Sequence, residues 1–256
     1  MLSDQPREQA GDLTNQLSDL GASCLEFPTI HIVPPADWSG LDQAIETIEE
    51  YAWVIFTSPN GVRFFFDRLE TLGLDLRSLK GIKIGAIGPA TAHLLSEYRL
   101  KADLIPEKYQ AEYLLEAFSR IALSNKKILI PRAEEARDVL PEGLRNLGAE
   151  VSVVHTYQTL PAVEGKEELK EKLSKGTIDC ITFTSSSTVI NFLALFHRQE
   201  VLALLKKVMI ACIGPITAQT AKNNGLDVNI IAEEYTIPGL VRAIEKYYSS
   251  KLNAES

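Results

Sequence analysis

WVIFTSPN at residues 53–60 and CITFTSSS at residues 180–187 share one pattern, in which four mostly apolar residues are followed by Thr-Ser. A short, continuous apolar run bounded by turn residues is typical of a parallel strand that is covered on both faces. The small polar residues that follow are typical of the first turn of a helix. Each stretch therefore predicts a buried strand that runs directly into a helix.

The similarity between the two stretches continues along the chain. At an offset of 127 residues Phe56 corresponds to Phe183, and LxxLGA at residues 17–22 corresponds to LxxLGA at residues 144–149. After a one-residue deletion the offset becomes 126, which relates IGPATA at residues 87–92 to IGPITA at residues 213–218, and Tyr109 to Tyr235. A colinear series with one deletion indicates an internal duplication.

Strands and helices are predicted to alternate through both copies. The apolar runs predict strands at Trp53–Thr57, Ile82–Ile87, Ala102–Ile105, Lys127–Ile130, Val151–His155, Asp179–Thr184, Val208–Ile213 and Val228–Ile231. Helical patterns lie at Leu41–Glu50, Gly61–Leu69, Thr91–Glu97, Glu112–Ile121, Glu135–Leu147, Glu167–Leu173, Val189–Leu195, Thr217–Asn223 and Gly239–Tyr247. This alternation implies an α/β fold with parallel sheets and right-handed crossovers. The repeat counterpart of the strand at Lys127–Ile130 falls at residues 1–3, but Met1–Pro6 is a poor strand sequence.

Two divisions into domains of about five strands are compatible with the repeat. A cut near residue 125 makes two consecutive domains. Cuts near Pro34 and Pro161 make a continuous domain at residues 34–159 and a discontinuous domain at residues 1–33 and 160–256. The stretches Pro28–Pro35 and His155–Pro161 are extended and repeat-related, and two antiparallel connectors there would favour the second division. In either case we expect the activity in a cleft between two similar domains.

Composition excludes several classes of function. The net charge of −8 argues against nucleic acid and anionic membranes as partners, since both require a basic surface. The sequence has no run of eighteen apolar residues and no apolar signal-peptide core near its beginning, so we expect a cytoplasmic protein without a membrane span. The three cysteines have no metal-type spacing, which predicts buried thiols and no metal site.

Candidate binding residues lie where strands run into helices, because ligands bind beyond the carboxyl ends of parallel strands. The first pair of turns offers hydroxyl groups and helix N-termini that suit carboxylate or phosphate, at Thr57 and Ser58 and at Thr184, Ser185, Ser186 and Ser187. Helix capping needs only one such residue, so the longer second run favours anion binding over capping alone. The second pair combines glycine and threonine, at Gly88 and Thr91 and at Gly214, Pro215 and Thr217. A plain strand–helix turn explains this second pair equally well.

One tyrosine and two arginines have less certain roles. Tyr157 lies in a connector, and its counterpart in the first copy is an isoleucine, so it is a candidate for a function that the copies do not share. Its hydroxyl could donate a proton, although a partly buried ring with a wet tip is the commoner role. Arg132 and Arg137 could hold carboxylates, or belong to a solvated helix face with Glu134 and Glu135.

The ordered set of motifs resembles the uroporphyrinogen-III synthase family. The set comprises the Phe-Thr-Ser strand ends, the Ile-Gly-Pro-x-Thr-Ala turns, the Leu-Gly-Ala helix ends, YQT at residues 157–159 and YTIPGL at residues 235–240. The resemblance extends from about Arg7 to Tyr248. One departure is that the family opens with a strand ending in Val-Thr-Arg, where this chain has SDQ at residues 3–5, so any role of that arginine is absent.

The resemblance implies two flavodoxin-like domains joined by a two-stranded connector, with the N-terminal segment in the C-terminal half. It implies a monomeric lyase of porphyrin and heme biosynthesis that uses no cofactor. Its substrate would be the linear tetrapyrrole hydroxymethylbilane, which loses its hydroxyl as water and closes to uroporphyrinogen III with the last pyrrole ring inverted, through a spiro intermediate. Tyr157 is similar in position to a family tyrosine that assists hydroxyl loss. Substrate carboxylates would be gripped by backbone N–H groups at Ser58, Ser185–Ser187, Gly88–Thr91 and Gly214–Thr217.

Two other classes of protein share parts of this pattern. A two-domain binding protein could close on an anionic ligand without chemistry, and its periplasmic versions need a signal peptide. A sugar-phosphate isomerase would have Ser/Thr-rich loops like Ser185–Thr188, and would need a Glu or His base near them.

Overall fold

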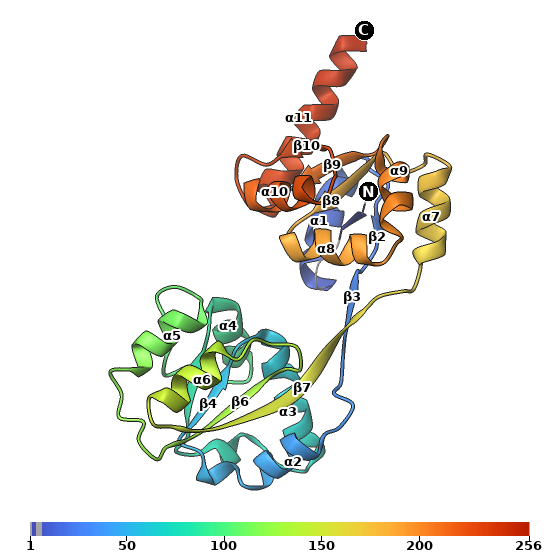
Figure 1. Ribbon diagram of the computed structural model, residues 1–256. Helices are drawn as coiled ribbons and strands as arrows, with labels where there is room; N and C mark the ends of the chain where they lie inside the picture. The colour runs from blue at the N-terminus through green and yellow to red at the C-terminus, as the bar shows by residue number, and fades with distance from the viewer. Residues whose placement is uncertain (1, 4–6, 256) are drawn as a thin grey trace. The chain divides into compact units, whose positions relative to one another are not determined.

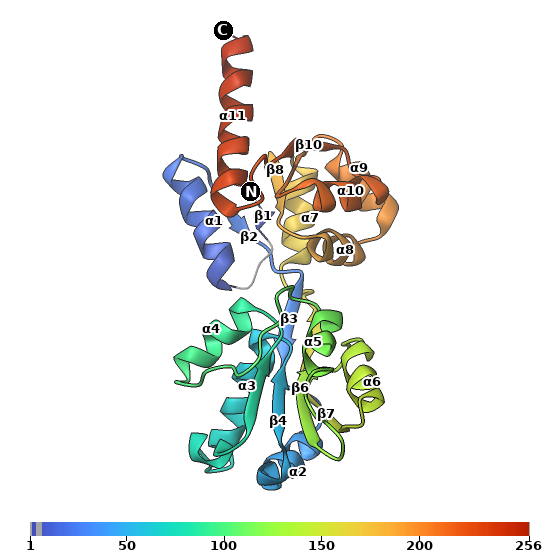
Figure 2. The same ribbon diagram turned by 90° about the vertical axis from the view of Figure 1, so that its left-hand side faces the viewer.

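The computed structural model describes residues 2–3 and 7–255, with side chains between residues 11 and 250 (Figures 1 and 2). The chain divides into two compact units. Ile32–Leu160 forms the continuous unit, and Met1–His31 together with Pro161–Ser256 forms the split unit. Each unit contains one five-stranded sheet.

In the continuous unit the sheet has the order β3-β7-β6-β4-β5. The strands are β3 (Ile30–Val33), β4 (Trp53–Phe56), β5 (Lys83–Ala86), β6 (Lys127–Ala133) and β7 (Glu150–Pro161). The pairs β4–β5, β4–β6 and β6–β7 are parallel. The helices are α2 (Ser39–Glu46), α3 (Pro59–Thr71), α4 (Pro89–Glu97), α5 (Ala111–Phe118) and α6 (Val139–Asn146), with short 3₁₀ helices η1 (Ile48–Glu50) and η2 (Leu76–Leu79).

The sheet of the continuous unit is covered on both faces. Val54 and Phe56 of β4 pack with α2, α3 and α4, while Trp53 and Ile55 pack with α5 and α6 on the other face. Figure 2 shows α3 and α4 on one side of this sheet and α5 and α6 on the other. All four residues of β4 are buried, which confirms the strand predicted from WVIF.

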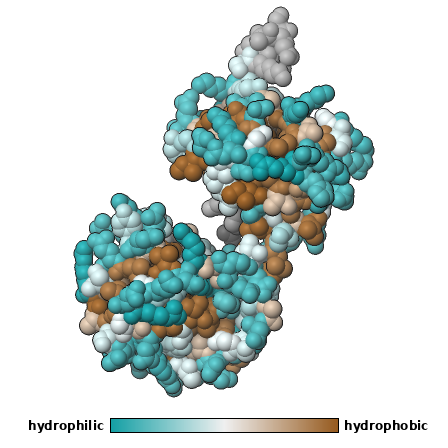
Figure 3. All heavy atoms as spheres, viewed as in Figure 1, coloured by the Kyte–Doolittle hydropathy of each residue, from teal (hydrophilic) through white to brown (hydrophobic). Residues whose placement is uncertain are grey.

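In the split unit the sheet has the order β10-β9-β8-β1-β2 and all its pairs are parallel. The strands are β1 (Leu2–Ser3), β2 (Leu25–Glu26), β8 (Cys180–Phe183), β9 (Met209–Cys212) and β10 (Val228–Ile231). The helices are α1 (Arg7–Asp19), α7 (Lys166–Ser174), α8 (Ser186–Ala194), α9 (Arg198–Leu205), α10 (Pro215–Asn223) and α11 (Ile237–Glu255). One face packs against α7–α10 and the other against α1 and α11 (Figure 2). Figure 3 shows apolar groups among hydrophilic residues on the viewed face of each unit.

The sheet of the split unit has the strand order of flavodoxin, 2-1-3-4-5, and four strands of the other sheet follow part of that order. In the split unit the order is β2-β1-β8-β9-β10 in sequence rank. In the continuous unit β7-β6-β4-β5 follows the first four places of this order if counting starts at β6. The strand β3 lies beyond β7, and beyond β5 there is only a single bridge between Gly85 and Leu104. Each sheet thus combines the first two strands of one sequence repeat with the later strands of the other.

The predicted strand at Ala102–Ile105 is wrong, because only that bridge forms. The side chain of Asp103 accepts a hydrogen bond from the Ile84 N–H at 2.8 Å, so this carboxylate replaces a backbone partner. Asn229 accepts from the Ile210 N–H at 2.8 Å in the same way, and β10 there remains a strand with a register shift.

Other element boundaries also differ from the prediction. The helix expected at Glu135–Leu147 begins only at Val139, the one expected at Leu41–Glu50 is split into α2 and η1, and α9 was not predicted. The poor N-terminal strand sequence does form β1, although with only two residues. The Asp4 and Gln5 positions of the departure from the family pattern lie outside the described residues.

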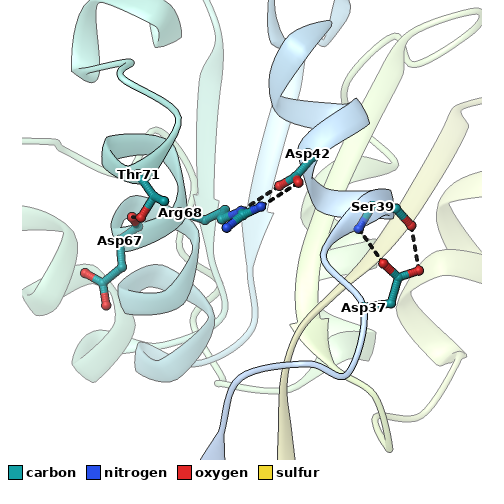
Figure 4. A network of polar contacts seen from close by, with 6 residues as sticks. All are labelled: Asp37, Ser39, Asp42, Asp67, Arg68 and Thr71. Atoms are coloured by element: carbon teal, nitrogen blue, oxygen red, sulfur yellow. Dashed lines mark hydrogen bonds and ion pairs between the residues drawn. The ribbon is translucent and has the colours of Figure 1, made fainter.

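An ion pair fixes α2 to α3 in the continuous unit (Figure 4). Arg68 donates to both carboxylate oxygens of Asp42 at 2.6 Å, and its guanidinium lies 4.9 Å from the ring centre of Trp38. Asp37, two residues before the start of α2, accepts hydrogen bonds from the N–H and hydroxyl of Ser39. The hydrogen bonds from Arg68 lower the pKa of Asp42.

Within the described part of the chain, no single helix has both the length and the apolar character of a membrane span. By length and composition alone, α8 and α9 taken together would pass as one span, but they are bent by 115° at their break.

Candidate functional site

A cavity of about 590 Å³ opens at the carboxyl ends of the strands in the continuous unit. Its walls include the ends of β4, β6 and β7, at Thr57, Ser58, Arg132, Ala133 and Tyr157. The helices that follow β4 and β6, which are α3 and α6, cover opposite faces of the sheet. The cavity therefore lies at the switch point of the sheet, the place where α/β folds bind ligands.

Ser58 and Tyr157 meet in this cavity although 99 residues separate them. The Ser58 Oγ and the Tyr157 hydroxyl form a hydrogen bond of 2.9 Å. Ser58 is also the N-cap of α3, since its Oγ accepts from the Gly61 N–H at 3.0 Å. One serine thus caps a helix and contacts the predicted catalytic tyrosine.

Gly61 explains how α3 comes so near to β6. A Cβ on this residue would lie 3.0 Å from the Pro131 carbonyl oxygen, so the first turn of α3 packs directly against the strand backbone. This close approach needs glycine. It holds Ser58 next to the end of β6.

Tyr157 is buried and orientated by its neighbours. Its side chain is only 7% exposed and stacks on Phe64 with 5.9 Å between ring centres. Burial raises the pKa of Tyr157 above its ordinary value of 10; the hydrogen bond from Ser58 opposes this shift and the charge of Glu135 adds to it. The phenol therefore stays protonated at neutral pH and is available as a proton donor.

Arg132 holds the loop that forms one wall of the cavity. Its guanidinium, 6% exposed, donates to the Arg137 carbonyl oxygen at 2.7 Å and to Asp138 Oδ1 at 2.5 Å. These bonds hold residues 137 and 138 against β6, just before α6 begins at Val139. The Glu134 N–H donates to the Tyr157 carbonyl oxygen at 3.1 Å, which ties the same loop to β7.

The alternative of a solvated helix face is wrong for Arg132, because this residue is buried in β6. Its Nε is buried without a hydrogen-bond partner and belongs to a residue that lines the cavity. Arg137 is exposed at the cavity wall. Arg132 is ion-paired with Asp138, so the exposed Arg137 is the more accessible positive group at the cavity wall.

In the split unit the Thr-Ser run lies at the equivalent turn, after β8. Ser185 caps α8 by accepting from the Thr188 N–H at 3.2 Å, and its hydroxyl also contacts Ser187 at 2.9 Å. The Ser186 hydroxyl accepts from Thr220 at 2.8 Å. Thr184 differs, since its hydroxyl is buried without a hydrogen-bond partner and could bind a ligand group.

The two Gly-Pro turns begin α4 and α10. Gly88 and Gly214 are the N-cap residues, and neither offers a side-chain cap. Thr91 and Thr217 are 2% and 5% exposed, so a ligand would meet the backbone N–H groups of these first turns rather than the threonine hydroxyls.

The structure brings the predicted residues together in pairs. Because β4 neighbours β5, the turns at Ser58 and Gly88 lie at the same edge of the sheet in the continuous unit. In the split unit β8 neighbours β9, so the turns at Ser185 and Gly214 also lie at one sheet edge. Sequence reasoning missed two other groups of the cavity, Glu135 beside Tyr157 and Tyr109 in the wall. The only signal for Tyr109 was its recurrence as Tyr235.

Among the described residues there is no group of three or more His, Cys, Asp or Glu side chains that could hold a metal ion. The functional groups that the structure places at the candidate site are a buried phenol, hydroxyl groups, arginines and helix N-termini.

The sequence matches the family model described as uroporphyrinogen-III synthase HemD over residues 11–242. The chain belongs to the uroporphyrinogen-III synthase family. This is a family of enzymes of the lyase class, in tetrapyrrole biosynthesis.

Individual relatives agree with this assignment. The chain is 32% identical to a uroporphyrinogen-III synthase from Synechococcus elongatus, over 96% of this chain and 94% of that protein. It is 35% identical to the porphyrin biosynthesis protein HemD of Ruminiclostridium josui over 94% of this chain, which spans about half (47%) of that longer protein. A crystal structure of mutant uroporphyrinogen III synthase from Thermus thermophilus has a similar fold, with a TM-score of 0.67 at 19% identity, over 97% of this chain and 98% of that one.

Proposed function

We propose that this chain catalyses the closure of hydroxymethylbilane to uroporphyrinogen III, with loss of water and inversion of the last pyrrole ring. The observation that carries the proposal is the buried pair of Ser58 and Tyr157 in a cavity at the switch point of the sheet. It gives a proton donor to a family whose reaction begins with the loss of a hydroxyl group.

The hydrogen bonds around Ser58 suit Tyr157 to the role of general acid. The Gly61 N–H donates to the Ser58 Oγ, which leaves the serine proton free to point toward the tyrosine oxygen. The Tyr157 proton can then be directed to the substrate hydroxyl. As the phenol gives up its proton, the same serine donates to the developing phenolate and stabilises it.

The reaction balances as a dehydration. Tyr157 protonates the leaving hydroxyl, the carbon–oxygen bond breaks, and water departs. The substituted carbon of the last ring then attacks the carbon that the hydroxyl has left, and this bond gives the spiro intermediate. Rearrangement of the intermediate inverts the last ring. The proton lost when the macrocycle closes restores the tyrosine. No cofactor takes part in this sequence.

Binding of the substrate is proposed to rest on local positive groups, since the chain carries a net charge of −8. Backbone N–H groups at the four strand–helix turns, with Arg137, would hold substrate carboxylates. The proposed substrate-binding residues are Thr57, Ser58, Gly88, Thr91, Thr184, Ser185, Ser186, Ser187, Gly214, Pro215 and Thr217. Holding a flexible chain in one folded shape is how the enzyme would favour the inverted product over spontaneous closure.

The test is incubation with hydroxymethylbilane and chromatographic separation of the type I and type III products. The wild-type protein should form the type III isomer. Tyr157→Phe should lower the turnover number by about 10²–10⁴-fold, the usual contribution of one general acid. Type I product alone from the wild-type protein would refute the proposed function, and unchanged turnover and product in Tyr157→Phe would remove only the tyrosine from the mechanism.

We also propose that the enzyme acts as a monomer in the cytoplasm, and that its two units arose from one duplicated flavodoxin-like unit joined by a two-stranded connector. The repeat in sequence and the partly shared strand order support the duplication. Light scattering of the purified protein tests the monomer, because the chain mass of 28.3 kDa would double in a dimer.

A further inference from the structure

Glycine at position 88 is explained by the limited space for a side chain there and not by its backbone conformation. Its φ of −161° is extended and open to any residue. A Cβ at this position, however, would lie 3.3 Å from the Cβ of Tyr109 and 3.5 Å from its Cγ. The stem of the tyrosine therefore rests on the glycine backbone at the start of α4.

The same arrangement recurs in the split unit. Gly214 has an extended φ of −175°, and a Cβ on it would lie 3.0 Å from Cδ1 and 3.2 Å from Cγ of Tyr235. Tyr109 and Tyr235 are counterparts in the sequence repeat, as are the two glycines. Both copies thus keep a tyrosine that packs against the glycine of a Gly-Pro turn.

This packing does not bury the rings. Tyr109 is 60% exposed and Tyr235 is 65% exposed. Between residues 11 and 250, every other Phe, Trp and Tyr side chain is buried or half-buried. Tyr109 also lines the cavity that contains Ser58 and Tyr157. A tyrosine that packs against a turn and still remains largely exposed is suited to contact a ligand.

We propose that Tyr109 and Tyr235 are stacking platforms for pyrrole rings of the substrate, an assignment that rests on the proposed function. The proposed carboxylate-binding groups hold only the charged side chains of a tetrapyrrole, so the flat rings need partners of their own. An aromatic side chain provides an apolar face and an offset-stacked geometry. Contact with Gly88 or Gly214 restricts the tyrosine before binding, so less side-chain freedom is lost when a ring docks.

The experiment compares steady-state kinetics with hydroxymethylbilane for Tyr109→Leu, Tyr235→Leu and Tyr109→Phe. Tyr113→Leu is the matched control, since Tyr113 does not line the cavity and its hydroxyl accepts from Lys108 on the surface. Each leucine variant should raise KM about 3- to 10-fold, the usual range for one aromatic pair, with kcat within about twofold of wild type. Tyr109→Phe keeps the ring and should keep the wild-type KM, as should Tyr113→Leu.

Gly88→Ala provides a second perturbation that keeps the ring but displaces it, and it should also raise KM. The inference is overturned if Tyr109→Leu leaves KM unchanged, or if Tyr109→Phe raises KM as much as the leucine variant, which would indicate a role for the hydroxyl. Type III product from the wild-type protein together with either result leaves the proposed function standing. Type I product alone from the wild-type protein overturns both proposals.

Discussion

Replacing Ser58 by alanine should destabilise the continuous unit more than the loss of an ordinary helix cap. The change removes the acceptor for the Gly61 N–H, and an N-cap serine is worth about 1 kcal/mol. It also leaves the Tyr157 hydroxyl without a partner in a side chain that is 7% exposed, which costs a further 1–3 kcal/mol or so. We therefore expect the free energy of unfolding to fall by about 2–4 kcal/mol.

The similar turn of the split unit supplies the control for this experiment. Ser185→Ala removes the equivalent cap, in which the Thr188 N–H donates to the serine Oγ at 3.2 Å, but no buried tyrosine depends on it. Its cost should be about 1 kcal/mol. The Ser185 hydroxyl also contacts the hydroxyls of Ser187 and Thr188, so the comparison matches the cap, and the contact with Tyr157 is isolated by the double-variant cycle below.

Urea unfolding monitored by tryptophan fluorescence is the appropriate assay. The chain has two tryptophans, Trp38 and Trp53, and both lie in the continuous unit, so the signal reports that unit. Circular dichroism, which reports the helices of both units, is used for Ser185→Ala because both tryptophans lie in the other unit. In a cycle with Tyr157→Phe, the double variant should be less destabilised than the sum of the single variants by about 1 kcal/mol. Additivity within about 0.3 kcal/mol would refute the coupling between Ser58 and Tyr157.

Two further predictions concern other parts of the chain. The pKa of Asp42 is lowered in the folded state by Arg68, so the ion pair stabilises the fold above the unfolded pKa of Asp and this contribution is lost as pH falls through the folded pKa. Asp42→Asn should lower the free energy of unfolding by about 1 kcal/mol at pH 7 and should have no effect once Asp42 is protonated at low pH. Urea unfolding at several pH values measures this, and an equal loss of stability at every pH would contradict the prediction. Burial raises the pKa of Cys180 and Cys212 to about 12, so a thiol reagent should label half-buried Cys24 first in the native protein, and all three after unfolding. Rapid native labelling of Cys212 would count against its burial.

Local elements were predictable where one physical rule dominates. Four mostly apolar residues predict β4 and β8, and the hydroxyl residues that follow predict the caps of α3 and α8. The missed features depend on side chains from elsewhere. The Asp103 carboxylate accepts a backbone N–H from β5, and the Arg132 guanidinium binds residues 137 and 138 just before α6 begins. No periodicity in the affected segments carries that information.

By itself the sequence determined the α/β class, the repeat, the strand–helix turns and membership of the family. These follow from patterns along the chain, since a strand, a cap or a motif is written in neighbouring residues. Only the tertiary structure decided which strands pair, so that β1 and β2 join β8 rather than β4, and that Ser58 and Tyr157 share a hydrogen bond. The physical reason is that such contacts depend on how distant segments pack, and the energy of each contact exists only after the sheet has formed.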